Sequence, residues 1–135
     1  RAFEDARLVA QTFQDKTSYN FTVWSSKAER AKTTAKLLVN QLQNRVEDFQ
    51  IKDEFYTFDA SEVLHLIHQL PETINDMMLV GHNPAYTHLV NYFCKDVELA
   101  NLPTTGLVEL LFDVHSWSKV KDANCGIHLF PKQLN

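Results

Sequence analysis

The stretch that most constrains the fold is a run of four apolar residues, 77–80, which ends at Gly81. A short strand that is apolar at every position suits a sheet buried on both faces. His82 follows the glycine, and Asn83 and Pro84 then have the character of an N-cap and a first helical residue. The sequence therefore predicts an imidazole at the carboxyl end of a buried strand, beside a helix N-terminus. Open α/β sheets bind ligands at such positions, and free helical N–H groups attract anions there.

Strand and helix patterns alternate along the first two thirds of the chain. The predicted helices cover residues 2–15, 26–43, 60–70 and 84–94, and the predicted strands cover 21–24, 49–56, 77–80, 106–114 and 126–130. This order predicts an α/β fold, a three-layer sandwich with a mostly parallel mixed sheet and helices on both faces. The last two strands are close enough in sequence to form an antiparallel edge. Residues 1–135 are expected to form a single domain.

Composition narrows the classes of partner. The chain is 44% hydrophobic and 22% charged, as an ordinary globular protein is, and its formal charge is −4. It has no Lys/Arg run for nucleic acid or an acidic membrane, no apolar stretch that spans a bilayer, and no signal peptide. Cys94 and Cys125 make neither a disulfide framework nor a metal spacing, which favours a reducing cytoplasm. We expect a small ligand or a protein as partner, and neither nucleic acid nor membrane.

A second candidate site residue follows another predicted strand. The chain has only three glycines and no glycine-rich phosphate loop, so side chains must supply most of any phosphate site. Arg30 lies in the first turns of the helix after the strand at 21–24, and Thr34 shares its face. A guanidinium matches pairs of phosphate oxygens. We therefore predict that Arg30 and His82 converge on one anion, with Asn83 as a helix cap and, secondarily, a ligand.

Several segments resemble one known family. SSKAERAKTTAKLL is similar to the S-S-x-x-x-R-A-x-x-T-A-x-L-L segment of the histidine phosphatase superfamily, and LVGHNP resembles the turn of its SixA-type branch, the phosphohistidine phosphatases. The likeness continues through EFYTFDASEVLHLIHQLP, NLPTTGLVELLFD and GIHLFPKQL, and RAFEDARLVAQTF resembles the helix after the family's first strand. The resemblance thus covers nearly the whole chain, in order.

The resemblance implies a phosphoglycerate mutase-like fold and a metal-free, cofactor-free reaction. A phosphoryl group would pass to an active-site histidine and then to water. Arg30 would be a phosphate-binding arginine, and His82 the second histidine of the site. The family's nucleophile lies in an Arg-His motif at the end of the first strand, yet no Arg-His dipeptide occurs in these 135 residues. We therefore expect the nucleophile, and the first strand, upstream of Arg1.

The resemblance leads to one preferred function and one alternative. The preferred function is a phosphatase acting on phosphohistidine in a protein or on a small phosphate monoester. The brief segment at 44–76 leaves the pocket open, which favours a protein substrate. The alternative is a catalytically inactive domain of the same fold that binds phosphate-like anions or another protein.

Other polar residues have simpler interpretations. His65 and His68 have a spacing that can hold a metal, but they lie opposite the apolar face of their helix and have no third ligand nearby, so we expect both to be exposed and no metal site. Glu54 is a candidate proton donor, whereas turn chemistry explains Thr104 and Thr105 as well as a phosphate contact would. Neither cysteine has an arginine six residues downstream and no G-x-S-x-G elbow occurs, which excludes the cysteine-phosphatase loop and serine hydrolases.

Overall fold

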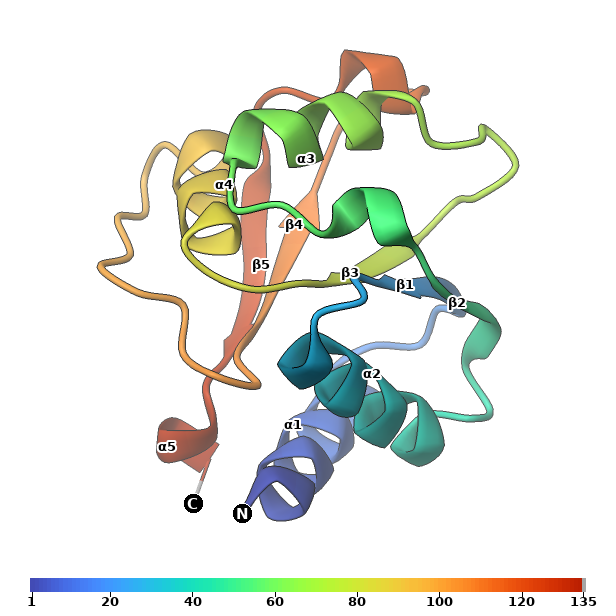
Figure 1. Cartoon of the computed structure of the whole chain (residues 1–135), viewed down its shortest axis with the longest axis vertical. Helices are drawn as coiled ribbons and strands as arrows, with labels where there is room; N and C mark the ends of the chain where they lie inside the picture. Colours follow the sequence, from blue (N-terminus) through green and yellow to red (C-terminus); the bar gives the residue numbers. More distant parts are fainter. Residues whose placement is uncertain (135) are drawn as a thin grey trace.

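A computed structural model of the chain describes residues 1–134. In chain order, the elements are α1 (Ala2–Lys16), β1 (Phe21–Ser25), α2 (Glu29–Gln41), β2 (Val46–Ile51), the 3-10 helix η1 (Asp53–Phe55), α3 (Ala60–His68), β3 (Met77–Val80), α4 (Ala85–Phe93), β4 (Leu107–Leu111), η2 (Trp117–Lys119), β5 (Asn124–Leu129) and α5 (Pro131–Leu134). The predicted alternation of strands and helices is confirmed (Figure 1).

The first three strands form a parallel sheet in the order β2-β1-β3. Helices cover both faces of this sheet, as predicted for an α/β sandwich. The core on one face joins α1 and α2 to β1 through residues such as Val9, Ala35 and Val23. The core on the other face joins α3 and α4 and includes Val63 and Phe93.

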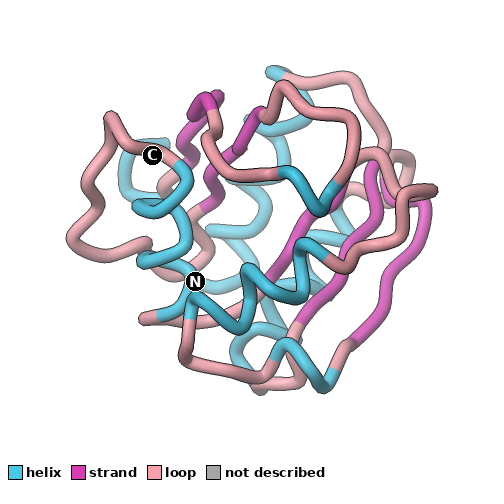
Figure 2. The backbone as a smooth tube through the Cα atoms, turned by 90° about the horizontal axis from the view of Figure 1, so that it is seen from above, coloured by secondary structure: helices cyan, strands magenta, loops and turns pink. Residues whose placement is uncertain are grey.

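The last two strands form a separate antiparallel sheet, β4-β5. The antiparallel pairing is confirmed, but the expected single mixed sheet is divided in two, and Figure 2 shows the strands in two groups. Within residues 1–134, β3 pairs only with β1 and β4 only with β5, so each has an unpaired edge. The expected burial of 77–80 on both faces is therefore incomplete: Val80 is buried, whereas the three residues before it are only partly buried.

Three local predictions were wrong in detail. The strand expected at 49–56 begins earlier and gives way to η1, because the chain turns after Ile51. The helix expected at 26–43 begins only at Glu29, so Ser26 and Glu29 do not form the capping box that their spacing permits. Pro84 precedes α4 instead of opening it.

The cysteines also behave differently from the prediction. Cys94, at the end of α4, and Cys125, in β5, form a disulfide, with their Cα atoms 6.1 Å apart. The sequence does not predict this disulfide, because 31 positions separate the two cysteines and no local pattern links them. The disulfide removes the argument for a reducing compartment, which depended on unpaired cysteines. No helix in the described part of the chain has the length and apolar character needed to cross a membrane.

Replacing Cys125 by serine is expected to lower the free energy of unfolding by roughly 2–4 kcal/mol, because the cross-link no longer restricts the unfolded chain. Urea unfolding of the variant and of the parent protein, each with and without reductant, measures the difference. Reductant should destabilise the parent to the level of the variant and leave the variant unchanged. Equal stability of the oxidised parent and the variant would contradict the prediction.

Candidate functional site

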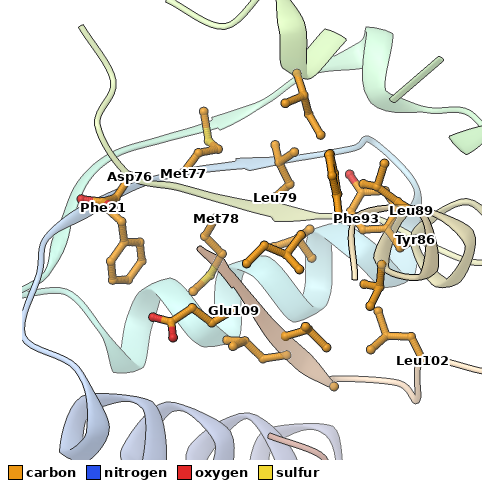
Figure 3. Close-up of a pocket in the computed structure, with 18 of the residues that line it drawn as sticks. Phe21, Asp76, Met77, Met78, Leu79, Tyr86, Leu89, Phe93, Leu102 and Glu109 are labelled. Atoms are coloured by element: carbon orange, nitrogen blue, oxygen red, sulfur yellow. The ribbon is translucent and has the colours of Figure 1, made fainter. Parts of the chain in front are cut away.

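A cavity of about 990 Å³ runs between the unpaired edges of β3 and β4. We call it the inter-sheet slot. In Figure 3, Met78 and Glu109 mark its two strand walls, with Asp76 toward one end and Tyr86 and Leu102 toward the other. Arg30 and His82 both line the inter-sheet slot, so the structure places the two predicted residues on one cavity.

His82 follows β3 after one residue, Gly81, which brings the backbone close to the partly buried ring of Tyr86. A Cβ atom at position 81 would meet the Tyr86 ring at 2.2 Å, so this position requires glycine. The His82 side chain is fixed on one side by Ser26, whose Oγ lies 3.5 Å from Nδ1. Its Nε2 atom is buried and has no hydrogen-bond partner in residues 1–134. A buried polar atom without a partner is unusual in a folded protein and is a candidate contact for a ligand.

The contact with Ser26 determines which ring nitrogen of neutral His82 carries the hydrogen. Its Oγ atom accepts the backbone N–H of Ala28 at 3.4 Å, which leaves the hydroxyl proton available for Nδ1 of His82. When Nδ1 accepts a hydrogen bond from this hydroxyl, the neutral ring carries its hydrogen on Nε2. Nε2 is then a donor, the type of group that a phosphoryl oxygen requires.

Arg30 lies in the first turn of α2 and is exposed. It makes no ion pair within the described chain, since its neighbour Glu29 contacts Lys32 at 3.4 Å. Thr34, which shares its helix face, also lines the inter-sheet slot. The guanidinium donors of Arg30 are therefore free for an anion.

Asn83 does not occupy the N-cap position predicted for it, which is held by Pro84, but its side chain still accepts an N–H from the first turn of α4. Its Oδ1 accepts the backbone N–H of Thr87 at 3.1 Å and the Thr87 hydroxyl at 2.7 Å. Its side-chain nitrogen donates to the Leu102 carbonyl at 2.8 Å and to Asn101 at 3.2 Å. Both N–H groups of the side-chain amide are thus engaged, and Asn83 has no free side-chain donor for the substrate-binding role that was expected. Asn83 instead ties the turn to the loop before β4.

The two ends of the inter-sheet slot differ in the charge of the side chains that line them. At the end opposite His82, burial raises the pKa of Asp76, and repulsion from Glu47 and Glu109 raises it further. Glu109 accepts a 2.7 Å hydrogen bond from Tyr19, and burial together with this contact raises the pKa of the Tyr19 hydroxyl. An anion is therefore favoured at the Arg30 and His82 end and disfavoured at the acidic end.

The remaining polar candidates divide between the cavity and the surface. Thr104 and Thr105 line the inter-sheet slot, whereas Glu54 and His65 are exposed outside it. His68 is not exposed as predicted. It is partly buried, and its Nε2 atom lies 3.0 Å from the Val120 carbonyl oxygen. No group of three metal-ligating side chains occurs within residues 1–134.

Two features of the site were missed at the level of sequence. Ser26 was expected at the start of the helix at 26–43, but it lies before that helix, is buried and contacts His82. Two exposed aromatic residues, Tyr56 and Phe58, contact the His82 ring. The alternation in EFYTF is the one sequence signal for the second feature, since it puts every other side chain on the surface.

Comparisons with known proteins agree on the fold. No protein-family model and no curated protein matches the chain. The protein histidine phosphatase SixA solved in complex with tungstate matches it with a TM-score of 0.76 at 19% identity, over 96% of this chain and 81% of that chain. A structure from Nakamurella multipartitia, assigned as phosphohistidine phosphatase SixA, matches equally well at 16% identity, again over 96% and 81%. A third, assigned likewise, from Agrobacterium tumefaciens, has a TM-score of 0.65 at 26% identity, over 80% of this chain and 71% of that chain.

The fold predicted from the resemblance is thereby confirmed. The agreement includes the parallel strands and the helices that flank them. This chain has the fold of the SixA-type phosphohistidine phosphatases.

Proposed function

We propose that the chain belongs to a phosphatase that hydrolyses phosphohistidine in a protein, or a small phosphate monoester, through a phosphohistidine enzyme intermediate. One observation carries the proposal: Arg30 and His82 line one cavity, and the Nε2 atom of His82 is buried there without a partner. The fold supports it, since one structure with the same fold is a histidine phosphatase with bound tungstate, a tetrahedral oxyanion.

Phosphoryl transfer depends mainly on the positioning of the reacting groups and on neutralisation of the negative charge on the phosphoryl oxygens. In the proposed reaction a nucleophilic imidazole attacks phosphorus, a P–N bond forms, and the bond to the leaving group breaks as that group takes up a proton. Water then cleaves the new P–N bond and releases phosphate. Arg30 holds two phosphoryl oxygens with its fork of donors and His82 donates to another, so no metal is required in the proposal.

We place the nucleophile on a strand upstream of Arg1 that fills the inter-sheet slot. Two strand edges without partners face the slot, and apolar helix residues such as Leu38 and Leu89 line it. A strand that runs parallel to β3 ends at the same edge of the sheet as β3 does, next to His82. Its last residue would then reach a phosphoryl group held by Arg30.

The test is tungstate binding to residues 1–135, measured by calorimetry. Arg30→Ala and His82→Ala are each expected to weaken binding by about 10-fold or more, as a charge-assisted hydrogen bond is worth roughly 1.5–3 kcal/mol. Arg7→Ala is the matched control, because Arg7 pairs with Glu4 on α1 and does not line the inter-sheet slot. Binding that is unchanged in both site variants would remove the phosphate site from the proposal.

An inactive anion-binding domain would give the same binding result, so turnover must separate the two functions. A polypeptide that contains the residues before Arg1 should release phosphate from a phosphohistidine peptide and form an acid-labile phosphoenzyme. Tungstate binding without either activity would favour the inactive alternative.

A further inference from the structure

Two exposed aromatic side chains lie against the imidazole of the proposed site. Tyr56 is 50% exposed and Phe58 is 59% exposed. Their ring centroids lie 5.5 Å and 4.7 Å from that of His82, and 6.1 Å from each other. Single exposed apolar residues are common, but adjacent rings beside a ligand cavity mark a binding surface. Neither ring has a task in the proposed phosphoryl transfer.

The backbone that carries these rings is fixed by the residues between and around them. Phe55 is 2% exposed and packs edge-on against Trp24, with 6.1 Å between the ring centroids. Thr57 is also buried, and its hydroxyl donates to Glu62 at 2.9 Å. With every second side chain anchored inward, Tyr56 and Phe58 are held outward on a stable segment.

Lys27 extends the same surface. Its Nζ atom lies 5.5 Å from the centroid of the Tyr56 ring, a cation–π distance. This charge stands beside the phosphate site proposed above and favours an anionic group there. The surface therefore combines a cation with aromatic faces, and it adjoins the ring of His82, whose Nε2 atom is buried and has no partner within residues 1–134.

We propose that Tyr56 and Phe58 form a subsite for the group attached to phosphorus, and that this subsite favours a planar aromatic group over an aliphatic one. The inference rests on the proposed function, because it assumes that a phosphoryl group binds His82. A group bonded directly to that phosphorus must lie within a few ångströms of the imidazole, where the two rings are. The imidazole of a phosphohistidine and the ring of an aryl phosphate both present a flat face that stacks on such rings, whereas an alkyl group does not.

The test compares two stable ligands that differ only in this group, phenylphosphonate and methylphosphonate. The parent chain is expected to bind phenylphosphonate about 10-fold more tightly, the preference that two ring contacts typically provide. In Phe58→Ala, which keeps the Tyr56 ring, the ratio of the two dissociation constants should fall to about 3. Using the ratio cancels any effect of the substitution on His82 itself. Phe58→Leu keeps the apolar surface without the ring and should also lose most of the preference.

Tyr92→Ala is the matched control. Tyr92 is 38% exposed and has Lys95 at 4.5 Å from its ring centroid, so it repeats the ring-and-cation arrangement away from His82. Its loss should leave the ratio unchanged. Equal affinity of the parent for both phosphonates, or a full preference in Phe58→Leu, would overturn the aromatic subsite. If one of these results is obtained while tungstate still binds in a way that depends on Arg30, only the aromatic subsite is wrong. If neither tungstate nor a phosphonate binds, the proposed function is wrong as well.

Discussion

Replacing Arg30 by alanine is expected to lower kcat/KM for a phosphohistidine peptide by about 100- to 1,000-fold, the loss typical of one missing oxyanion donor. The reason is geometric. Phosphoryl transfer spreads negative charge over three equatorial oxygens, and Arg30 is an unpaired cation on the cavity that contains His82. The measurement is steady-state hydrolysis by a polypeptide that carries the upstream strand proposed above.

Two further variants make this result specific. Arg30→Lys keeps the charge but not the planar fork, so it should recover only part of the lost activity. Arg7→Ala removes a cation that already pairs with Glu4 at 3.1 Å and lies outside the inter-sheet slot, so it should be as active as the parent. Activity of Arg30→Ala within about 3-fold of the parent would mean that this residue does not stabilise the transition state.

The order of elements could be predicted because the local patterns are strong. The helix expected at 2–15 is α1, Ala2–Lys16, and the strand expected at 77–80 is β3 with the same bounds. The position of Arg30 and His82 on one cavity follows from strand direction, since parallel strands end at one edge of a sheet. These inferences need only periodicity and the direction of the chain.

Features that depend on contacts between distant segments could not be predicted. The Cys94–Cys125 disulfide and the engagement of Asn83 with Leu102 join segments whose proximity no local pattern reveals. Ser26 has the sequence spacing of a cap, but the start of α2 three residues later frees it to contact His82. Local pattern therefore identifies the groups of the site, whereas tertiary contact decides which of them remain free.

A polypeptide that contains the strand proposed for the inter-sheet slot is expected to unfold with a free energy at least about 3 kcal/mol higher than residues 1–135. Met77, Met78 and Leu79 are only partly buried, as are the first four residues of β4, although all but Glu109 are apolar. Full burial of an exposed large apolar side chain contributes roughly 1.5–3 kcal/mol, so completing the burial of these six partly buried apolar side chains accounts for the difference. Denaturant unfolding of both polypeptides measures it.

Hydrogen exchange locates the same effect in the structure. The loop residue Leu102 meets Asn83 at the end of β3, whereas Trp117 contacts the Ile74 carbonyl at 2.8 Å near its start, so β4 runs opposite to β3. A strand parallel to β3 would therefore pair in parallel with β3 and antiparallel with β4. Amides of β3 and β4 that have no partner in β1 or β5 should exchange slowly in the longer polypeptide and fast in residues 1–135. Amides of β2, at the far edge of the sheet, serve as the internal control and should not change. Equal stability of the two polypeptides, with fast exchange along both edges, would show that the slot is not filled by a preceding strand.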